Sequence, residues 1–306
     1  MKLSSVLQGY WLDKELEFSP NTVAQYRYVF QHLSDFFGED ADFAGITSVD
    51  VRRFMLWLHN ERGVTKRTIS DYWISLSSLW TWAERELETT HVIRGKIPQP
   101  SYTTKVIEPF TPDEIGRIIK AAEETNEWTT RGGRQVRSKR NTADRDKAII
   151  LVLADTGIRA TELCDLTIAD YDEKRGRFHV RQGKGDKARY VVAGKRTQKA
   201  IWRYLAARAD AQPLAPLFAT RTGKLNRTNL YHMIRRLGEQ SGVANAHPHR
   251  FRHTFAVTFL RNGGNVKALQ ELLGHETLEM VMNYVKLADQ DLDEAQRRSP
   301  IDNWRI

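Results

Sequence analysis

The sequence predicts a mostly helical, two-domain protein in which an N-terminal helical bundle precedes an α+β domain with a small β-sheet. Its 306 residues exceed the usual size of one domain. Apolar residues recur every three or four positions through most of 19–87, whereas strand-like alternation is clearest in 177–182 and 188–193. We therefore expect domains over 1–94 and 110–306, joined by a linker over 95–109.

The first domain is expected to contain three amphipathic helices. The first follows the helix-start signal Ser19-Pro20, and the others run from near Ser48 to Gly63 and from near Thr65 to Leu87. Short connections between such helices are typical of a small bundle. The 95–109 segment contains three of the nine prolines and shows no helical periodicity, which favours an extended linker.

The second domain is expected to open with a helix at Thr111-Pro112, because a cap, a first-turn proline and Glu114 stand in capping-box order. A polar, basic loop is expected over 126–142, followed by a helix that ends near Asp155. A turn containing GKGDK joins the two strands. Helical patterns then cover 196–209, 226–241, 248–262, 266–273, 277–287 and 289–297.

Positive charge is concentrated in the second domain. The net charge is +9, but residues 1–95 sum to −3 and residues 96–306 to +12. Residues 174–203 alone hold 11 basic side chains and one acid. Such a field suits a polyanion such as nucleic acid, and a solvated basic surface is the alternative. The candidate DNA contacts are Arg52, Arg53, Lys66, Arg67, Arg134, Arg137, Lys139, Arg140, Lys187 and Arg189.

Several classes of protein are excluded. No apolar run reaches about 18 residues, so no membrane span is expected, and the first residues lack the apolar core of a secretory signal. The single cysteine, Cys164, can form no internal disulfide, which favours a cytoplasmic setting. No P-loop, HExxH or CxxC motif occurs, and the spacing of Cys164 with His247, His249 and His253 fits no common zinc site. We expect no metal and no small-molecule cofactor.

Five motifs in the second domain supply side chains that suit one reaction. Each alone has an ordinary structural explanation, such as a helix start, a hairpin tip or a core aromatic residue. Together they contain the groups needed to cleave a DNA phosphodiester with a tyrosine. In order they are TGIRATEL (156–163), GKGDKAR (183–189), HRFRH (249–253), LLGH (272–275) and Tyr284.

The chemistry places one demand on each group. A phenol with a pKa of about 10, such as that of Tyr284, needs a neighbouring base, for which His249 or His275 is available. The leaving 5′ oxygen needs a proton, which Lys184 on a mobile hairpin can donate.

Extra negative charge develops on the pentacoordinate phosphorus in the transition state. Arg159 and Arg252 can clamp its non-bridging oxygens, and their positive charge makes a metal unnecessary. Glu162 lies about one helical turn after Arg159 and can orient that turn.

In order and spacing, the five motifs resemble those of the tyrosine recombinases, the integrase family that includes Xer-type recombinases, phage integrases and Cre. The family pattern reads TGxRxxEL, GKGxKxR in a β-hairpin, HxLRH, LLGH and a tyrosine nine residues later. The resemblance covers 110–290, and residues 1–95 are similar, less specifically, to the family's helical core-binding (SAM-like) domain. The two departures are Phe251, where leucine is common, and the long 126–142 insertion.

The resemblance implies a site-specific DNA recombinase whose two domains close as a C-shaped clamp on double-stranded DNA. Its tyrosine would form a 3′-phosphotyrosine without ATP, and four identical protomers would exchange strands between two inverted-repeat sites. The segment 289–306 would dock on a neighbouring protomer, and the lack of a preceding arm-binding domain favours simple sites. The implied catalytic residues are Arg159, Lys184, His249, Arg252, His275 and Tyr284, with Glu162 in support.

Two other functions are open at this stage. A type IB topoisomerase would use the same chemistry to relax DNA, and a regulator on the same scaffold would bind DNA without cleaving it. Covalent trapping at Tyr284 would exclude the regulator, and strand exchange between duplexes would exclude the topoisomerase. No recognisable motif identifies the target DNA sequence. The motifs also do not distinguish an element integrase from a transposon resolvase or a chromosome-dimer resolvase.

Overall fold

The chain folds as two separate units, each with its own hydrophobic core. They comprise Met1–Lys105 and Val106–Ile306, so the division falls inside the predicted linker. Within the described residues, no helix is both long and apolar enough to span a bilayer. The computed structural model describes residues 1–103, 107–125, 128–129, 134–136, 138–181, 188–208, 212–274 and 277–288.

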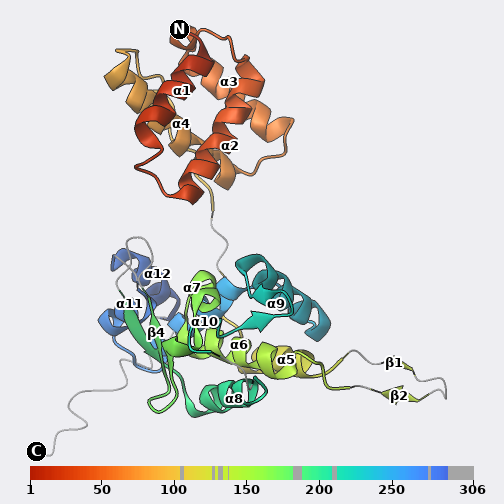
Figure 1. Cartoon of the computed structure of the whole chain (residues 1–306). Coiled ribbons are helices and arrows are strands. Elements are labelled where there is room, and N and C mark those ends of the chain that lie inside the picture. The colour runs from red at the N-terminus through yellow and green to blue at the C-terminus, as the bar shows by residue number, and fades with distance from the viewer. Residues whose placement is uncertain are drawn as a thin grey trace, which may run out of the picture. The chain divides into compact units, whose positions relative to one another are not determined.

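Over residues 1–103 the first unit contains four α-helices and one short 3-10 helix, where three helices were predicted (Figure 1). The additional α-helix is α1, which escapes prediction because Lys2 provides no capping side chain and the exposed Leu12 interrupts the apolar pattern. Buried Trp80 stacks on Phe43 at 4.9 Å between ring centroids and joins α4 to η1 in the core. The elements are α1 (Leu3–Lys14), α2 (Pro20–Phe37), η1 (Phe43–Gly45), α3 (Ser48–Asn60) and α4 (Lys66–Glu86).

The second unit packs helices around a small antiparallel sheet, which confirms the predicted fold class. The sheet has the order β3-β4-β5, and the two predicted strands pair with Phe178 opposite Val191. Its strands are β3 (Tyr171–Asp172), β4 (Arg177–Val180) and β5 (Arg189–Val192). The helices are α5 (Pro112–Glu123), α6 (Ala143–Thr156), α7 (Ala160–Asp165), α8 (Lys195–Ala206), α9 (Arg227–Ser241), α10 (Pro248–Arg261), α11 (Val266–Leu273) and α12 (Glu279–Ala288), with η2 (Ile168–Asp170) before the sheet.

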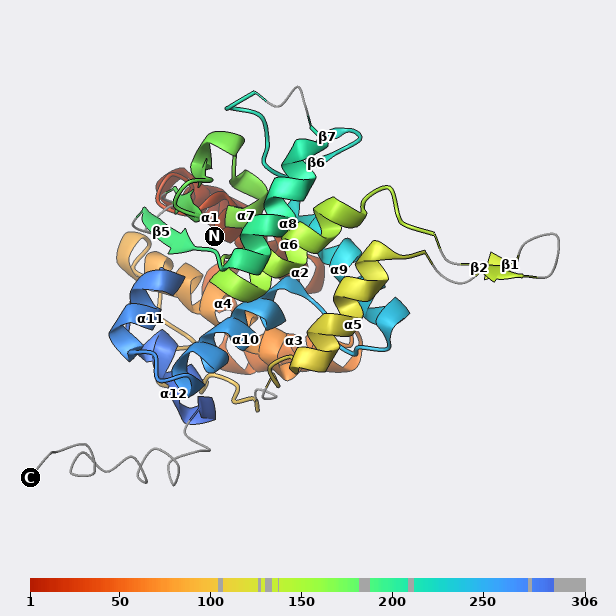
Figure 2. The same ribbon diagram turned by 90° about the horizontal axis from the view of Figure 1, so that it is seen from below.

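Two short hairpins complete the second unit. The segment predicted as a loop over 126–142 contains the hairpin of β1 (Trp128–Thr129) and β2 (Gln135–Val136), which projects from the unit beyond α5 (Figure 2). The other hairpin joins β6 (Ala219–Thr220) to β7 (Gly223–Lys224) ahead of α9. The predicted helix over 289–297 lies outside the described residues.

The end of α6 determines where the motif residues begin. This helix is central, because it packs against α5, α8 and α10. It ends at Gly157, whose φ of 62° is a left-handed conformation that side chains disfavour. A Cβ at this position would also lie 2.4 Å from Cδ1 of Phe255. Only glycine therefore fits the turn that brings Arg159 to the start of α7.

Candidate active site

Three arginines from separate elements converge on the C-terminal end of α11. Arg159 precedes α7, Arg189 lies on β5 and Arg252 lies on α10. The last carbonyls of a helix have no partner within it and carry the negative end of its dipole, so they suit cationic donors. Three consecutive carbonyls each accept one bond of 2.7 Å: Leu272 from Arg189 Nε, Leu273 from Arg252 Nη2, and Gly274 from Arg159 Nη2.

Glu162 holds two of these arginines together. Its carboxylate accepts bonds of 2.9 and 2.8 Å from Arg189 Nη1 and Nη2, and one of 2.9 Å from Arg159 Nη1. It also accepts a 2.8 Å bond from the Arg159 backbone N–H, which caps α7. Burial would raise the pKa of Glu162, but the bonds and charges of Arg189 and Arg159 outweigh burial and lower the pKa to about 2. Glu162 is therefore ionised and orients both guanidinium groups.

Arg252 is the most deeply buried member of the cluster. The residue is 3% exposed, and its Nη1 donates a 2.9 Å bond to the carbonyl of Gly157. Burial and the charge of Arg159 lower its pKa to about 10, although Glu162 and Tyr284 act in the opposite direction. Arg252 therefore keeps its charge at neutral pH.

Tyr284 reaches this cluster from α12, which packs against α10 and α11 of the same chain. The side chain is buried, and burial raises the pKa of its phenol. The charge of Arg252, a hydrogen bond from Arg252 and the charge of Arg159 act against this effect. The phenol is thus neutral at rest, while the neighbouring arginines favour the phenolate that forms when the proton leaves.

Two histidines on α10 lie near the cluster, of which His253 is buried and His249 is exposed at its surface. Burial and the charge of Arg252 lower the pKa of His249, which keeps the imidazole neutral and able to accept a proton. His253, for which no catalytic role was predicted, lies with its ring centroid 5.4 Å from that of Tyr284. Its Nε2 is buried and has no hydrogen-bond partner among the described residues. Burial lowers the pKa of His253 as well, so an uncharged acceptor stands beside the tyrosine.

Comparisons with known proteins agree with this arrangement. The model of the phage integrase family matches residues 108–291, and that of the phage integrase SAM-like domain matches residues 2–91. The chain belongs to the phage integrase family. It is 29% identical over 303 residues to tyrosine recombinase XerA of Pyrococcus horikoshii, which covers 97% of this chain and 94% of the relative. It is 30% identical over 302 residues to XerC of Oceanobacillus iheyensis, with 94% and 93% covered.

A solved structure of a variant Tn1549 transposon integrase in complex with transposon right end DNA shares the fold of this integrase. The TM-score is 0.77 at 17% identity, and the match covers 97% of this chain and 100% of the other.

The six predicted catalytic residues of this integrase divide into two groups. Arg159, Arg252 and Tyr284 come together, with His249 close to Arg252. Lys184 and His275 lie outside the described residues. Gly274, which directly precedes His275 in the sequence, accepts a hydrogen bond from Arg159 at its carbonyl oxygen. Among the described residues, no three His, Cys, Asp or Glu side chains are arranged to hold a metal ion.

The predicted DNA contacts differ in how far they are already engaged. Arg189 is 9% exposed at its side chain and bound to Glu162, which leaves little of its guanidinium accessible to DNA. Two other candidates of the second unit are also engaged: Lys139 pairs with Asp144, and Arg140 donates to Gln240. In the first unit, Arg52 donates to the carbonyl of Lys96 and Arg53 to Asp50, whereas Lys66 and Arg67 are exposed at the start of α4. Arg137 and Lys187 are outside the described residues, and Arg134 is exposed beside β2.

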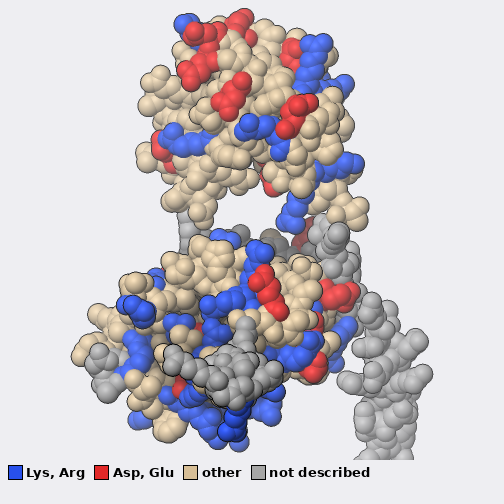
Figure 3. Space-filling view, turned by 90° about the vertical axis from the view of Figure 1, so that its right-hand side faces the viewer, with Lys and Arg blue, Asp and Glu red and all other residues tan. Residues whose placement is uncertain are grey.

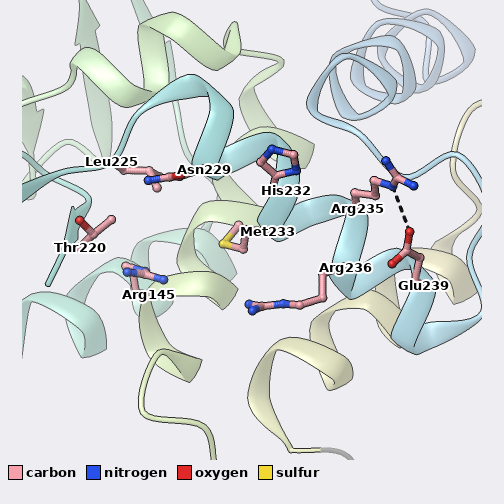
Figure 4. Close-up of a pocket in the computed structure, with 9 residues that line it drawn as sticks. All are labelled: Arg145, Thr220, Leu225, Asn229, His232, Met233, Arg235, Arg236 and Glu239. Atoms are coloured by element: carbon pink, nitrogen blue, oxygen red, sulfur yellow. Dashed lines mark hydrogen bonds and ion pairs between the residues drawn. The ribbon is translucent and has the colours of Figure 1, made fainter. Parts of the chain in front are cut away.

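A basic cavity of about 540 Å³ on α9 was not predicted from the sequence. It shares no lining residue with the arginine cluster and lies between α9, α6 and the β6–β7 hairpin. In Figure 4 the side chains of Arg145 and Arg236 extend toward each other below Met233. Arg235 on its rim pairs with Glu239 at 3.0 Å. Basic residues spaced along 227–241 were the available signal, but the partner elements come from distant parts of the chain.

Proposed function

We propose that this chain is a site-specific DNA recombinase that cleaves and rejoins double-stranded DNA through a covalent 3′-phosphotyrosine at Tyr284. The observation that carries the proposal is the burial of Tyr284 against Arg252, in the cluster that contains Arg159. Curated relatives of near-complete coverage are tyrosine recombinases.

The arginine cluster is suited to a phosphodiester because its geometry exists before DNA arrives. Arg159 and Arg252 are held by carbonyl oxygens and by Glu162, so little reorganisation is required when charge develops on the phosphate. Two guanidinium groups can donate several bonds to the non-bridging oxygens of the transition state.

Cleavage then requires two proton transfers. The phenol of Tyr284 loses its proton to a neutral imidazole as its oxygen bonds to phosphorus, and His249 is the described candidate that was predicted for this role. The bond from phosphorus to the 5′ oxygen breaks, and Lys184 donates the proton that converts this oxygen to a hydroxyl. The 5′-hydroxyl of a partner strand attacks the phosphotyrosine in the reverse sequence. Phosphodiester bonds are conserved in number, so no nucleotide triphosphate is consumed.

The finer parts of the assembly belong to the same proposal. We expect four protomers on two inverted-repeat sites, with the 289–306 segment of one protomer docking on the next. In this proposal, Met1–Lys105 serves as the core-binding unit and Val106–Ile306 as the catalytic unit.

Strand exchange between two duplexes tests the proposal and separates it from the alternatives. Two labelled duplexes would carry the inverted repeats that flank the gene, with arms of about 11 bp, roughly one helical turn. Recombinant products of new length are expected from the full chain and not from Tyr284→Phe. Covalent adducts without exchanged products would indicate a topoisomerase, and binding without adducts would indicate a regulator. Lys184→Ala should be rescued by a 5′-bridging phosphorothiolate, because sulfur leaves without an acid.

A further inference from the structure

One face of α8 carries four basic side chains without acidic partners. Lys195, Arg196, Lys199 and Arg203 are exposed, and α8 contains no Asp or Glu. None of the four makes a salt bridge or a side-chain hydrogen bond in the described part of the chain. Some other exposed arginines of the same unit are paired, as in Arg117–Asp113 and Arg235–Glu239, and in the described part of the chain no other helix of this unit gathers four exposed cations on one face without an acid of its own. We call these four residues the α8 cationic face.

The stability of α8 does not account for these charges. The helix is anchored by its opposite face, where Ile201 and Tyr204 are buried. Lys195 and Arg196 lie in the first turn, where the helix dipole disfavours cations, and the first turn contains no acid. Trp202 is 57% exposed among the basic residues and adds an apolar contact surface. The face therefore has the composition of a surface that binds a polyanion.

The α8 cationic face lies apart from the arginine cluster. The helix begins beside the end of α6, where Asp155 accepts a 2.8 Å bond from Thr197 Oγ1, and then follows α6 back toward its start. Arg196, Lys199 and Arg203 line a groove of about 420 Å³ there together with Lys147 and Asp144. The Asp144 carboxylate pairs with Lys139 and, within the described ranges, makes no salt bridge to α8. In Figure 1, α8 lies below α6 and α7 lies above it. Figure 3 shows Lys and Arg side chains gathered at the lower end of this unit.

We propose that the α8 cationic face is a second DNA-binding surface, which binds the phosphate backbone of a duplex segment other than the one at the arginine cluster. Arg196, Lys199 and Arg203 follow one line along the helix over about 10 Å, at a rise of 1.5 Å per residue. One DNA strand presents a phosphate about every 3.4 Å along the axis, so this line spans about three phosphates. Because DNA is taken as the polyanion, the inference rests on the proposed function.

Lysine footprinting of the unsubstituted protein tests the surface directly. The full chain would be acetylated briefly with and without a random-sequence 30-bp duplex, and the modification at each lysine would be measured by mass spectrometry. We expect Lys195 and Lys199 to react about threefold more slowly with the duplex, because bound phosphates cover the amines. Lys2, exposed in the first unit beside Asp40, should be unaffected and serves as the control. Unchanged acetylation of Lys195 and Lys199 would overturn the proposal.

A charge-matched pair of variants gives the second measurement. One variant combines Lys195→Gln, Arg196→Gln, Lys199→Gln and Arg203→Gln, and the control combines Lys2→Gln, Arg27→Gln, Arg85→Gln and Arg94→Gln. Both remove four positive charges from exposed positions. For the random duplex, the slope of log K against log salt should become shallower by about 0.9 for each phosphate that the α8 variant no longer neutralises. A slope equal to that of the control variant would refute the second surface.

Cleavage separates this inference from the proposed function. The α8 variant should still form the covalent adduct on a nicked suicide substrate at the level of the unsubstituted chain, because the α8 cationic face takes no part in catalysis. Loss of adduct in the folded α8 variant would mean that the face belongs to the catalytic surface, against the proposal. If the duplex protects Lys195 and Lys199 but the chain never cleaves DNA, the proposed function is wrong and the second DNA-binding surface is still supported.

Discussion

Replacement of Glu162 by glutamine should weaken the catalytic unit in a pH-dependent way. Glu162 joins Arg159 to Arg189, and through them joins α7 and β5 to the end of α11. Its pKa falls from an ordinary 4.5 to about 2 in the folded chain. At about 1.4 kcal/mol per pKa unit, ionisation contributes roughly 3 kcal/mol at pH 7. The carboxylate is only 12% exposed, so solvent screening removes little of this.

The sign follows from the lowered pKa. The stabilisation is fully present above the unfolded pKa of 4.5 and is lost as pH falls toward the folded value of about 2. At pH 3, roughly 1 kcal/mol remains. Glu162→Gln should therefore cost about 3 kcal/mol at pH 7 and about 1 kcal/mol at pH 3.

Urea unfolding of the full chain, followed by pulsed hydrogen exchange of peptides from α6 and α10, reports the catalytic unit alone. Glu239→Gln is the matched control, because its carboxylate pairs with Arg235 at the surface and should contribute less than about 1 kcal/mol at either pH. An equal loss of unfolding free energy for Glu162→Gln at pH 7 and pH 3, or no loss at pH 7, would refute the claim that an ionised Glu162 stabilises this unit.

Three further substitutions test the surrounding geometry. Arg252→Ala should retain DNA binding but reduce cleavage by about two orders of magnitude, the scale of lost transition-state electrostatics, while Arg261→Ala at the end of the same helix should cleave normally. Gly157→Ala should lower the free energy of unfolding by roughly 2–3 kcal/mol, because the left-handed backbone is strained and the new Cβ clashes with Phe255. The control Gly263→Ala has a φ of 81° but open space around it, so it should lose only about 1 kcal/mol. Equal losses for the two variants would show that the contact with Phe255 contributes nothing. His253→Phe keeps a ring against Tyr284 and removes the buried acceptor, so single-turnover cleavage should slow by about tenfold, and an unchanged rate would limit His253 to packing.

Local patterns in the sequence account for much of the fold. The start of α5 is an example, because Thr111 and Glu114 form both bonds of the predicted capping box. The strands β4 and β5 were also predicted, since two alternating runs flank a turn. These features depend on residues close together in the chain. The helix α1 was not predicted, because its sequence contains neither a capping side chain nor a regular apolar face.

The assignment of individual basic residues required the structure. Arg189 was predicted to contact DNA, but it binds Glu162 and the carbonyl of Leu272, 27 and 83 residues away in sequence. Charge composition does not predict which basic side chain forms an ion pair with an acidic one in the folded protein. The role of Glu162 was partly predictable, because it lies three residues after Arg159 at a helix start. Its second partner, Arg189, comes from the sheet and has no local signal.

The identity of the covalently attached tyrosine tests the central claim most directly. The full chain would be incubated with a nicked suicide duplex, the adduct digested, and the nucleotide-bearing peptide sequenced by mass spectrometry. The nucleotide should be found on Tyr284, one of the 10 tyrosines, and Tyr284→Phe should bind DNA yet form neither adduct nor recombinant product. A nucleotide on another tyrosine, or recombination by Tyr284→Phe, would contradict the account.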